Sequence, residues 1–203
     1  MLGTIYLQHM DWINDIEPQI IEDNARNYGH RTWANAEWSD ITLAFAVDFR
    51  SPGEITTKKA AGEKHIGFQL NADEVIDEFD NASLWEGKAR RFATFIRQNP
   101  HYTEDGIKLN IAGNSMITLA AHEIEKEQAE EVVYNIIKGL LTAGIKIAEV
   151  RSGGQTGIDE FGIKAAQRLG LKCSILAPKG FRMHYREGEE IEGREPFVRR
   201  FCK

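Results

Sequence analysis

Apolar residues follow two different patterns in the second half of the chain, and together these patterns predict alternating strands and helices. Residues 108–112 form a short run that ends at a Gly-Asn turn, and residues 145–150 alternate and are rich in β-branched side chains, so both predict strands. Residues 124–142 carry apolar side chains at spacings of three and four, the period of one helix face. A helix over about 157–169 and a strand over 171–176 follow. The order β-α-β-α-β predicts parallel strands joined by helical crossovers.

The first half of the chain repeats this alternation less regularly. Residues 41–47 predict a buried strand, 55–61 a short helix and 65–70 a second strand. Residues 11–38 hold three of the four tryptophans and predict helical or irregular structure. The polar stretch 71–106 predicts a connector with one amphipathic helix near its centre.

These elements predict an α/β fold with a Rossmann-like, mainly parallel sheet flanked by helices. We divide the chain into a segment containing a βαβ unit (1–70), a helical connector (71–106) and a Rossmann-like core (107–203). The pattern leaves open whether these parts form one intertwined domain or two.

Composition narrows the classes of function. The 203 residues are 42% hydrophobic and 28% charged, which is typical of a soluble globular protein. The net charge of -6 argues against a nucleic-acid partner but permits a small anionic ligand. The start lacks a readable signal peptide and no apolar run could span a bilayer, so we expect a cytoplasmic protein with no membrane partner. Two cysteines and six scattered histidines lack metal-binding spacing, so no metal site is predicted, and no cofactor is implied.

A glycine-rich turn between a predicted strand and helix is the strongest candidate site: Ser152-Gly153-Gly154-Gln155-Thr156-Gly157. Unpaired N–H groups at the start of a helix and the positive end of its dipole favour an anion there. Glycines let a phosphate approach the backbone closely, and the hydroxyl and amide side chains add donors. The turn lacks the Gly-Lys-Ser/Thr ending of a P-loop and the spacing of the dinucleotide fingerprint. We predict that it binds phosphate, and that Gly154→Val removes ligand binding from a folded protein.

Further candidates follow strands at the same predicted edge of the sheet, where open α/β sheets bind ligands. Lys179 would supply a counter-charge, and Asn114 and Asp48 each follow a strand. Asp159 and Glu160 either stabilise the start of their helix or serve as ribose contacts or general acids and bases.

The segment from Arg151 to Asp159, with Leu176-Ala177-Pro178-Lys179-Gly180 after it, resembles the SLOG superfamily of Rossmann-like domains. The similarity is closest to the branch of molybdenum-cofactor carriers and YpsA-like proteins, and it covers about 30 residues closely. It implies a nucleotide, an ADP-ribose-like molecule or a pterin as ligand, and it implies a dimer.

A second stretch, Ser39 to Phe45 followed by Ser51-Pro52-Gly53-Glu54-Ile55-Thr56, is similar to a later segment of the same branch. Here it precedes the glycine-rich turn, so the order of the segments is permuted. Glu54 stands where the family has a neutral donor, which favours a ribose contact over a phosphate contact. Gly53 and Thr56 complete this second candidate loop.

Three functions remain open from the sequence. The first is binding of a phosphate-bearing, nucleotide-derived small molecule by a sensor, carrier or sequestering protein that forms a homo-oligomer. The second is a hydrolase that cleaves the N-glycosidic or phosphate bond of a nucleotide, with Asp159, Glu160 or Glu54 as acid or base. The third is a molybdenum-cofactor carrier. A carboxyl group with a raised pKa inside the site would favour the enzyme.

Overall fold

A computed structural model of the chain describes residues 16–25, 27–77, 82–100, 102–184 and 190–202. The strands of its main sheet are β1 (Gln19–Glu22), β2 (Ile41–Ala46), β3 (His65–Gln69), β4 (Ile107–Gly113), β5 (Ile147–Ser152) and β6 (Cys173–Ala177). The helices up to the middle of the chain are α1 (Tyr28–Trp38), α2 (Pro52–Ala61), the short η1 (Gly62–Lys64), α3 (Ala72–Asp77) and α4 (Ala82–Arg97). The helices after β4 are α5 (Met116–Ala121), α6 (Lys126–Thr142), α7 (Ile158–Arg168), the short η2 (Lys179–Phe181) and α8 (Arg194–Val198). Strands β7 (Met183–His184) and β8 (Glu190–Ile191) form a small separate antiparallel pair.

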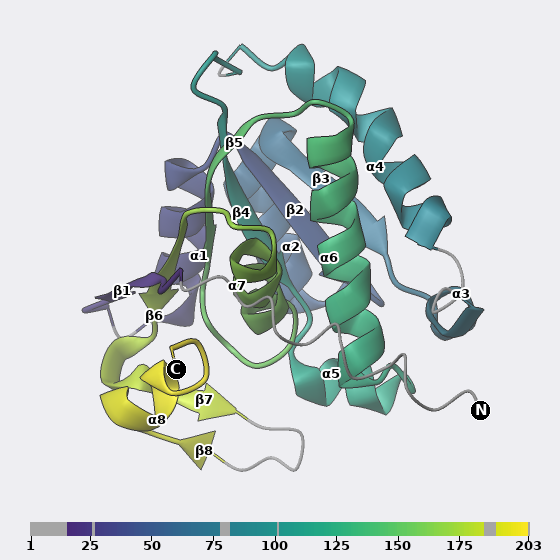
Figure 1. The fold of residues 1–203 in the computed structure, drawn as a ribbon. Coiled ribbons are helices and arrows are strands. Elements are labelled where there is room, and N and C mark those ends of the chain that lie inside the picture. The colour runs from purple at the N-terminus through teal and green to yellow at the C-terminus, as the bar shows by residue number, and fades with distance from the viewer. Residues whose placement is uncertain (1–15, 26, 78–81, 101, 185–189, 203) are drawn as a thin grey trace, which may run out of the picture.

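The main sheet has six parallel strands in the order β1-β6-β5-β4-β2-β3, with helices on both faces. Helices α1 and α2 pack together on one face, and α7 packs on β4, β5 and β6 from the other (Figure 1). Helix α6 lies beside α7, and α4 lies outside α6. This arrangement confirms the predicted α/β fold, and strands from both halves of the chain share one sheet.

The apolar patterns explain why these elements form. All six residues of β2 are buried, as expected for a central strand covered on both faces. In α6 the residues Val132, Val133, Ile136 and Ile137 are buried on one face. The helix begins where the Gln128 side chain accepts a hydrogen bond from the Glu125 amide at 2.9 Å. Gly144 follows its end with a positive φ of 81°, which suits the predicted cap.

Several short elements were not predicted, among them β1, α3 and α5. Strand β1 has four residues, too few to show a period, and it gains its place by pairing with β6 at the edge of the sheet. Helix α5 has six residues and begins after Ser115, whose side chain accepts a hydrogen bond from the Thr118 amide. The connector 71–106 contains α3 as well as the predicted amphipathic helix, α4.

The order of the strands reverses direction between β2 and β4. From β2 the chain crosses through α2 to β3 on one side, and from β4 it crosses through α5 and α6 to β5 on the other side. The two connections thus leave the carboxyl ends of β2 and β4 in opposite directions, which is the arrangement of a topological switch point. Ligands of open α/β sheets bind at such a switch point.

Within the described ranges, no helix combines the length and the apolar character needed to cross a membrane.

Candidate functional site

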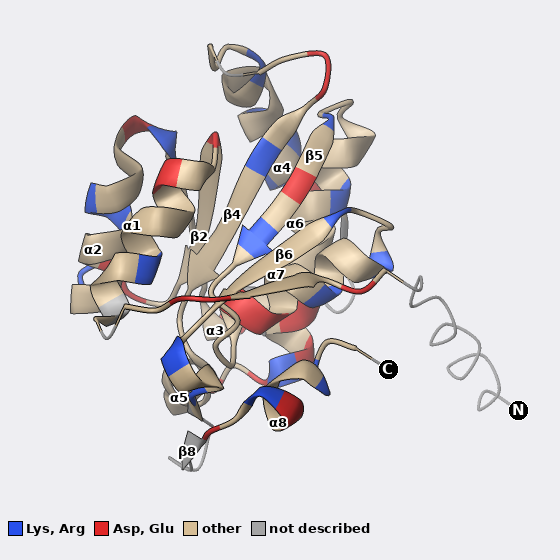
Figure 2. Ribbon diagram, turned by 90° about the vertical axis from the view of Figure 1, so that its left-hand side faces the viewer, with Lys and Arg blue, Asp and Glu red and all other residues tan. Residues whose placement is uncertain are grey.

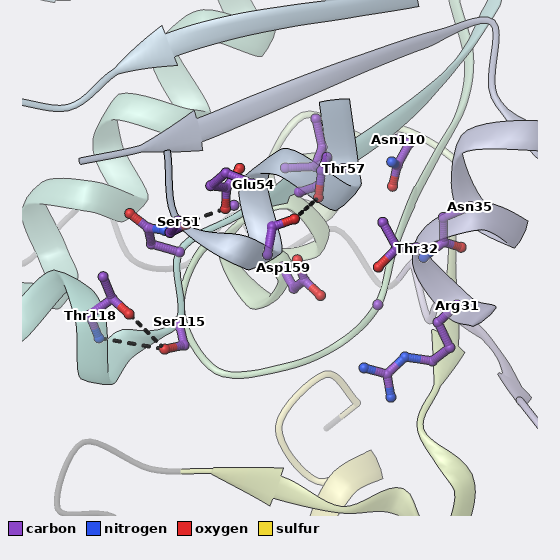
Figure 3. Close-up of a pocket in the computed structure, with 16 residues that line it drawn as sticks. Arg31, Thr32, Asn35, Ser51, Glu54, Thr57, Asn110, Ser115, Thr118 and Asp159 are labelled. Atoms are coloured by element: carbon purple, nitrogen blue, oxygen red, sulfur yellow. Dashed lines mark hydrogen bonds between the residues drawn. The ribbon is translucent and has the colours of Figure 1, made fainter. Parts of the chain in front are cut away.

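A cavity of about 290 Å³ lies at this switch point (Figure 3). Four segments that are far apart in the sequence form its wall. Helix α1 contributes Arg31, Thr32 and Asn35, and the start of α2 with its cap contributes Ser51, Gly53, Glu54 and Thr57. The segment from β4 into α5 contributes residues 110–115 and Thr118. The turn after β5 contributes Gly153, and the start of α7 contributes Asp159.

Glu54 is the most unusual group in this wall. Its side chain comes from the first turn of α2 and is only 4% exposed. Its Oε1 accepts a long hydrogen bond from Asn114 Nδ2 at 3.4 Å, and no described residue is a partner for its Oε2. Burial, together with the charge of Asp159, raises the pKa of Glu54 from its usual 4.5 to about 7. A large share of this carboxyl group therefore carries a proton at neutral pH.

Asn114 holds the two strand ends together beside Glu54. Its Oδ1 accepts a hydrogen bond of 2.8 Å from the amide of Val47, directly after β2. Because a backbone N–H can only donate, this bond fixes the orientation of the amide and turns Nδ2 toward Glu54. Asn114 is thus a positioning residue for Glu54.

Asp159, in the first turn of α7, is the second carboxyl group of the cavity. Burial raises its pKa from 3.8 to about 6, even though the positive charge of Arg31 and hydrogen bonds from the amides of Gln155 and Gly153 favour the charged form. Arg31 is itself buried in the wall, only 6% exposed. Asp159 is therefore the more acidic member of the pair.

Together these two carboxyl groups form a potential acid–base pair. Both titrate near neutral pH, and the charge of one raises the pKa of the other. Near pH 6.5 one group can carry a proton while the other is ionised. Pairs of carboxyl groups with separated pKa values are typical of active sites that use one group as acid and the other as base or stabiliser.

The glycine-rich turn is arranged differently from the prediction. The amides of Gly153 and Gln155 bond to Asp159, so a carboxylate of the protein occupies the place expected for a phosphate. A Cβ at Gly153 would lie 2.4 Å from Asp159 Oδ2, and one at Gly157 would lie 2.6 Å from the carbonyl oxygen of Asn114. These glycines therefore allow the turn to pack against its own carboxylate and against the turn after β4.

Gly154 is covered as well, which changes the expected effect of its substitution. Its φ is 72°, and a Cβ there would lie 2.5 Å from Ile175 and 2.6 Å from Phe197 of α8. Valine at this position would have a strained backbone and would force the side chains of Ile175 and Phe197 to shift. We therefore expect Gly154→Val to destabilise the fold, in contrast to the prediction made from the sequence.

Five of the predicted site residues line the cavity: Gly53, Glu54, Asn114, Gly153 and Asp159. Others of the glycine-rich turn have structural contacts elsewhere. Ser152 donates to the carbonyl oxygen of Ile111 at 2.8 Å, and Gln155 donates to that of Arg182 at 2.8 Å. The carbonyl oxygen of Thr156 accepts a bond from the Met116 amide.

The remaining predicted residues lie outside this wall. Lys179 is exposed in η2, and Asp48 pairs with Arg50 at 3.0 Å. The Thr56 hydroxyl donates to the carbonyl oxygen of Pro52 within α2. Glu160 is buried in ion pairs with Lys164, at 2.6 Å, and with Arg200, which attach the C-terminal segment to α7.

Arg151 also has a structural role, on the face of β5 that is turned toward α1. Its guanidinium lies 3.9 Å from the ring centre of Trp38, and its Nε donates to Ser174 Oγ at 3.0 Å. Ser174 in turn donates to Glu149. Strand β5 thus carries one acidic and one basic residue, as Figure 2 shows, and Ser174 bonds to both of them. This network is separate from the cavity wall.

Sequence reasoning missed eleven of the sixteen residues that line the cavity. Arg31, Thr32 and Asn35 lie in a stretch predicted only as helical or irregular, and Asn110 lies within a strand. No local motif marks these residues, because α1 reaches the cavity only through the pairing of β1 with β6 and the packing of α1 against α2.

Comparisons of the chain with protein-family models, curated proteins and solved structures found no match. In the parts of the chain that the structure describes, no group of three or more histidine, cysteine, aspartate or glutamate residues is placed to hold a metal ion.

Proposed function

We propose that this protein is an enzyme that binds a nucleotide-derived small molecule in the switch-point cavity and hydrolyses its N-glycosidic bond. One observation carries the proposal: Glu54 and Asp159, from different helices, line one polar cavity with pKa values raised to about 7 and about 6. Perturbed carboxyl groups in a cavity at the carboxyl edge of the sheet are the physical signature of an active site.

The environments of the two carboxyl groups assign their roles. Glu54 is the general acid, because burial and the charge of Asp159 favour its protonated form, whereas Arg31 and the amides of Gly153 and Gln155 favour the ionised form of Asp159. Asp159 is the base, and its charge also stabilises the positive charge that develops on the sugar. Arg31 supports the ionised form of Asp159.

The proposed reaction is a balanced hydrolysis. The bond between C1′ and the base nitrogen breaks, and its electron pair goes to the nitrogen, which takes the proton of Glu54. A water molecule adds to C1′ and gives a proton to Asp159. The products are the free base and the free sugar, and exchange of protons with solvent restores both carboxyl groups.

Two other functions receive less support from the geometry. Phosphate binding by the glycine-rich turn would have to displace Asp159 from the amides of Gly153 and Gln155. A carrier for a pterin would be expected to offer aromatic or thiol contacts, and none of the sixteen lining residues of the cavity is aromatic or a cysteine.

Release of free base tests the proposal. Purified protein is incubated at pH 6.5 with ribonucleosides and their 5′-monophosphates, and bases are separated by chromatography. We expect release by the wild type and a loss of about 10²- to 10⁴-fold in Glu54→Gln and in Asp159→Asn. Glu37→Gln, at an exposed position of α1, is the matched control and should keep the wild-type rate. Binding of these compounds without release of base would contradict the proposal and favour a sensor or carrier.

A further inference from the structure

The wall of the cavity is polar on all sides, which is unusual for a site that holds a flat heterocyclic base. Ile111 and Ala112 provide the only apolar side chains among its sixteen lining residues, and none is aromatic. Sites that hold bases usually flank them with aromatic or apolar side chains, and small-molecule pockets are mostly apolar. Threonine and serine hydroxyls and asparagine amides dominate here, as Figure 3 shows for Thr32, Asn35, Asn110 and Ser115. This composition matches a ligand with hydroxyl groups around its whole rim.

Three side chains of the wall have buried polar atoms for which the described part of the chain provides no hydrogen-bond partner. They are Asn35 Oδ1, Asn110 Oδ1 and Glu54 Oε2, whose residues are each 5% exposed or less. A buried polar atom without a hydrogen bond costs about 1–3 kcal/mol, so a cluster of three is expected where a ligand supplies the partners. A hydroxyl group both donates and accepts, and it can therefore pair with an amide in either orientation and with a carboxyl in either protonation state.

The size of the cavity restricts the ligand further. At about 290 Å³ it lies near the lower limit of small-molecule sites, which is about 300 Å³. A sugar ring fits this space, whereas a whole nucleotide would extend beyond it.

We infer that the cavity binds the ribose of the substrate and leaves the base outside, so the enzyme is strict toward the sugar hydroxyls and permissive toward the base. This inference rests on the proposed function and names the substrate class of the same site. Asn35 and Asn110 bind the 2′- and 3′-hydroxyls, while Glu54, through its Oε2, and Asp159 act at C1′, where the departing base faces the opening.

The experiment compares kcat/KM for base release from adenosine, guanosine, cytidine and uridine with kcat/KM for their 2′-deoxy and 3′-deoxy counterparts. We expect the four ribonucleosides to agree within about tenfold, and loss of either hydroxyl to lower kcat/KM by about 10²-fold or more, as in sites built to bond a substrate hydroxyl. Equal rates for the ribo and deoxy compounds, or activity confined to one base, would overturn the inference while the proposed hydrolysis stands.

A binding measurement separates failure of the inference from failure of the proposed function. Ribose 5-phosphate and 2-deoxyribose 5-phosphate are titrated into the wild type by calorimetry, with Asn110→Ala as a second sample. One outcome is that the protein binds ribose 5-phosphate at least about tenfold more tightly than 2-deoxyribose 5-phosphate and yet hydrolyses no nucleoside. In that case the inferred sugar site stands and the proposed reaction fails. Asn110→Ala should reduce that preference, with folding checked by circular dichroism. Equal binding of the two sugars would overturn the inference.

Discussion

Replacing Glu54 by glutamine should make the protein more stable at neutral and alkaline pH, because it removes a buried carboxyl group that resists ionisation. The pKa of Glu54 is raised from 4.5 to about 7, so the folded protein holds this proton more tightly than the unfolded chain does. The stability from this group is therefore fully present below about pH 4.5 and is lost as the pH rises through about 7. Integrated over that window, the loss is about 3 kcal/mol.

Glutamine has nearly the same shape and can still accept the hydrogen bond from Asn114 Nδ2 through its Oε1. The difference in the free energy of unfolding between Glu54→Gln and the wild type should grow by about 3 kcal/mol between pH 4.5 and pH 8. For a chain of this size, that corresponds to an increase of roughly 6–12 °C in the difference between their Tm values.

Urea unfolding followed by fluorescence at half-unit steps of pH measures this directly. Glu37→Gln, on the exposed side of α1, is the control and should follow the wild type at every pH. If the free energies of unfolding of the wild type and of Glu54→Gln differ by the same amount at every pH from 4.5 to 8, the fold does not hold the Glu54 carboxyl group protonated. That result would refute the reasoning from burial.

Three further substitutions test the structural roles assigned to Glu160 and to the glycine-rich turn. Glu160→Gln should lower the free energy of unfolding by about 3 kcal/mol, because it deprives the buried guanidinium of Arg200 of its partner. Its kcat, corrected for the folded fraction, should match the wild type, and a loss of about 10²-fold or more would instead return Glu160 to the candidate catalytic groups. Gly154→Val should abolish cooperative unfolding or lower Tm steeply, whereas Gly53→Ala, where a Cβ meets nothing within 4 Å, should keep the wild-type Tm within a few degrees. Equal Tm values for the two variants in a thermal melt would contradict the packing described for the turn.

Periodic apolar patterns were enough to predict most of the fold, because the central strands and the long helices each carry a clear period. Helices α6 and α7 and strands β2, β4, β5 and β6 lie within a few residues of their predicted ranges. Strand β1 was missed because four residues without a period are held in place only by pairing with β6, more than 150 positions later in the chain.

The candidate site was only partly accessible to sequence reasoning. Asn114 could be named because it follows a strand, Asp159 because it follows the glycine-rich turn, and Glu54 because its loop resembles a segment of the SLOG superfamily. The residues of α1 could not, because their position depends on the packing of α1 against α2 rather than on any local motif. The glycine-rich turn was a sound signal for a close approach of the backbone, but the group that approaches Gly153 is Asp159 of the same chain. The SLOG resemblance and the dimer that it implies stay predictions.

The most direct test of the acid–base pair is the pH dependence of kcat/KM for base release. Since Asp159 must be ionised and Glu54 protonated, the wild type should show a narrow bell with limbs near pH 6 and pH 7 and a maximum near pH 6.5. In the residual activity of Glu54→Gln the alkaline limb should disappear. A wild-type profile that stays flat from pH 5 to pH 8, or an alkaline limb that persists in Glu54→Gln, would contradict the assignment of this pair.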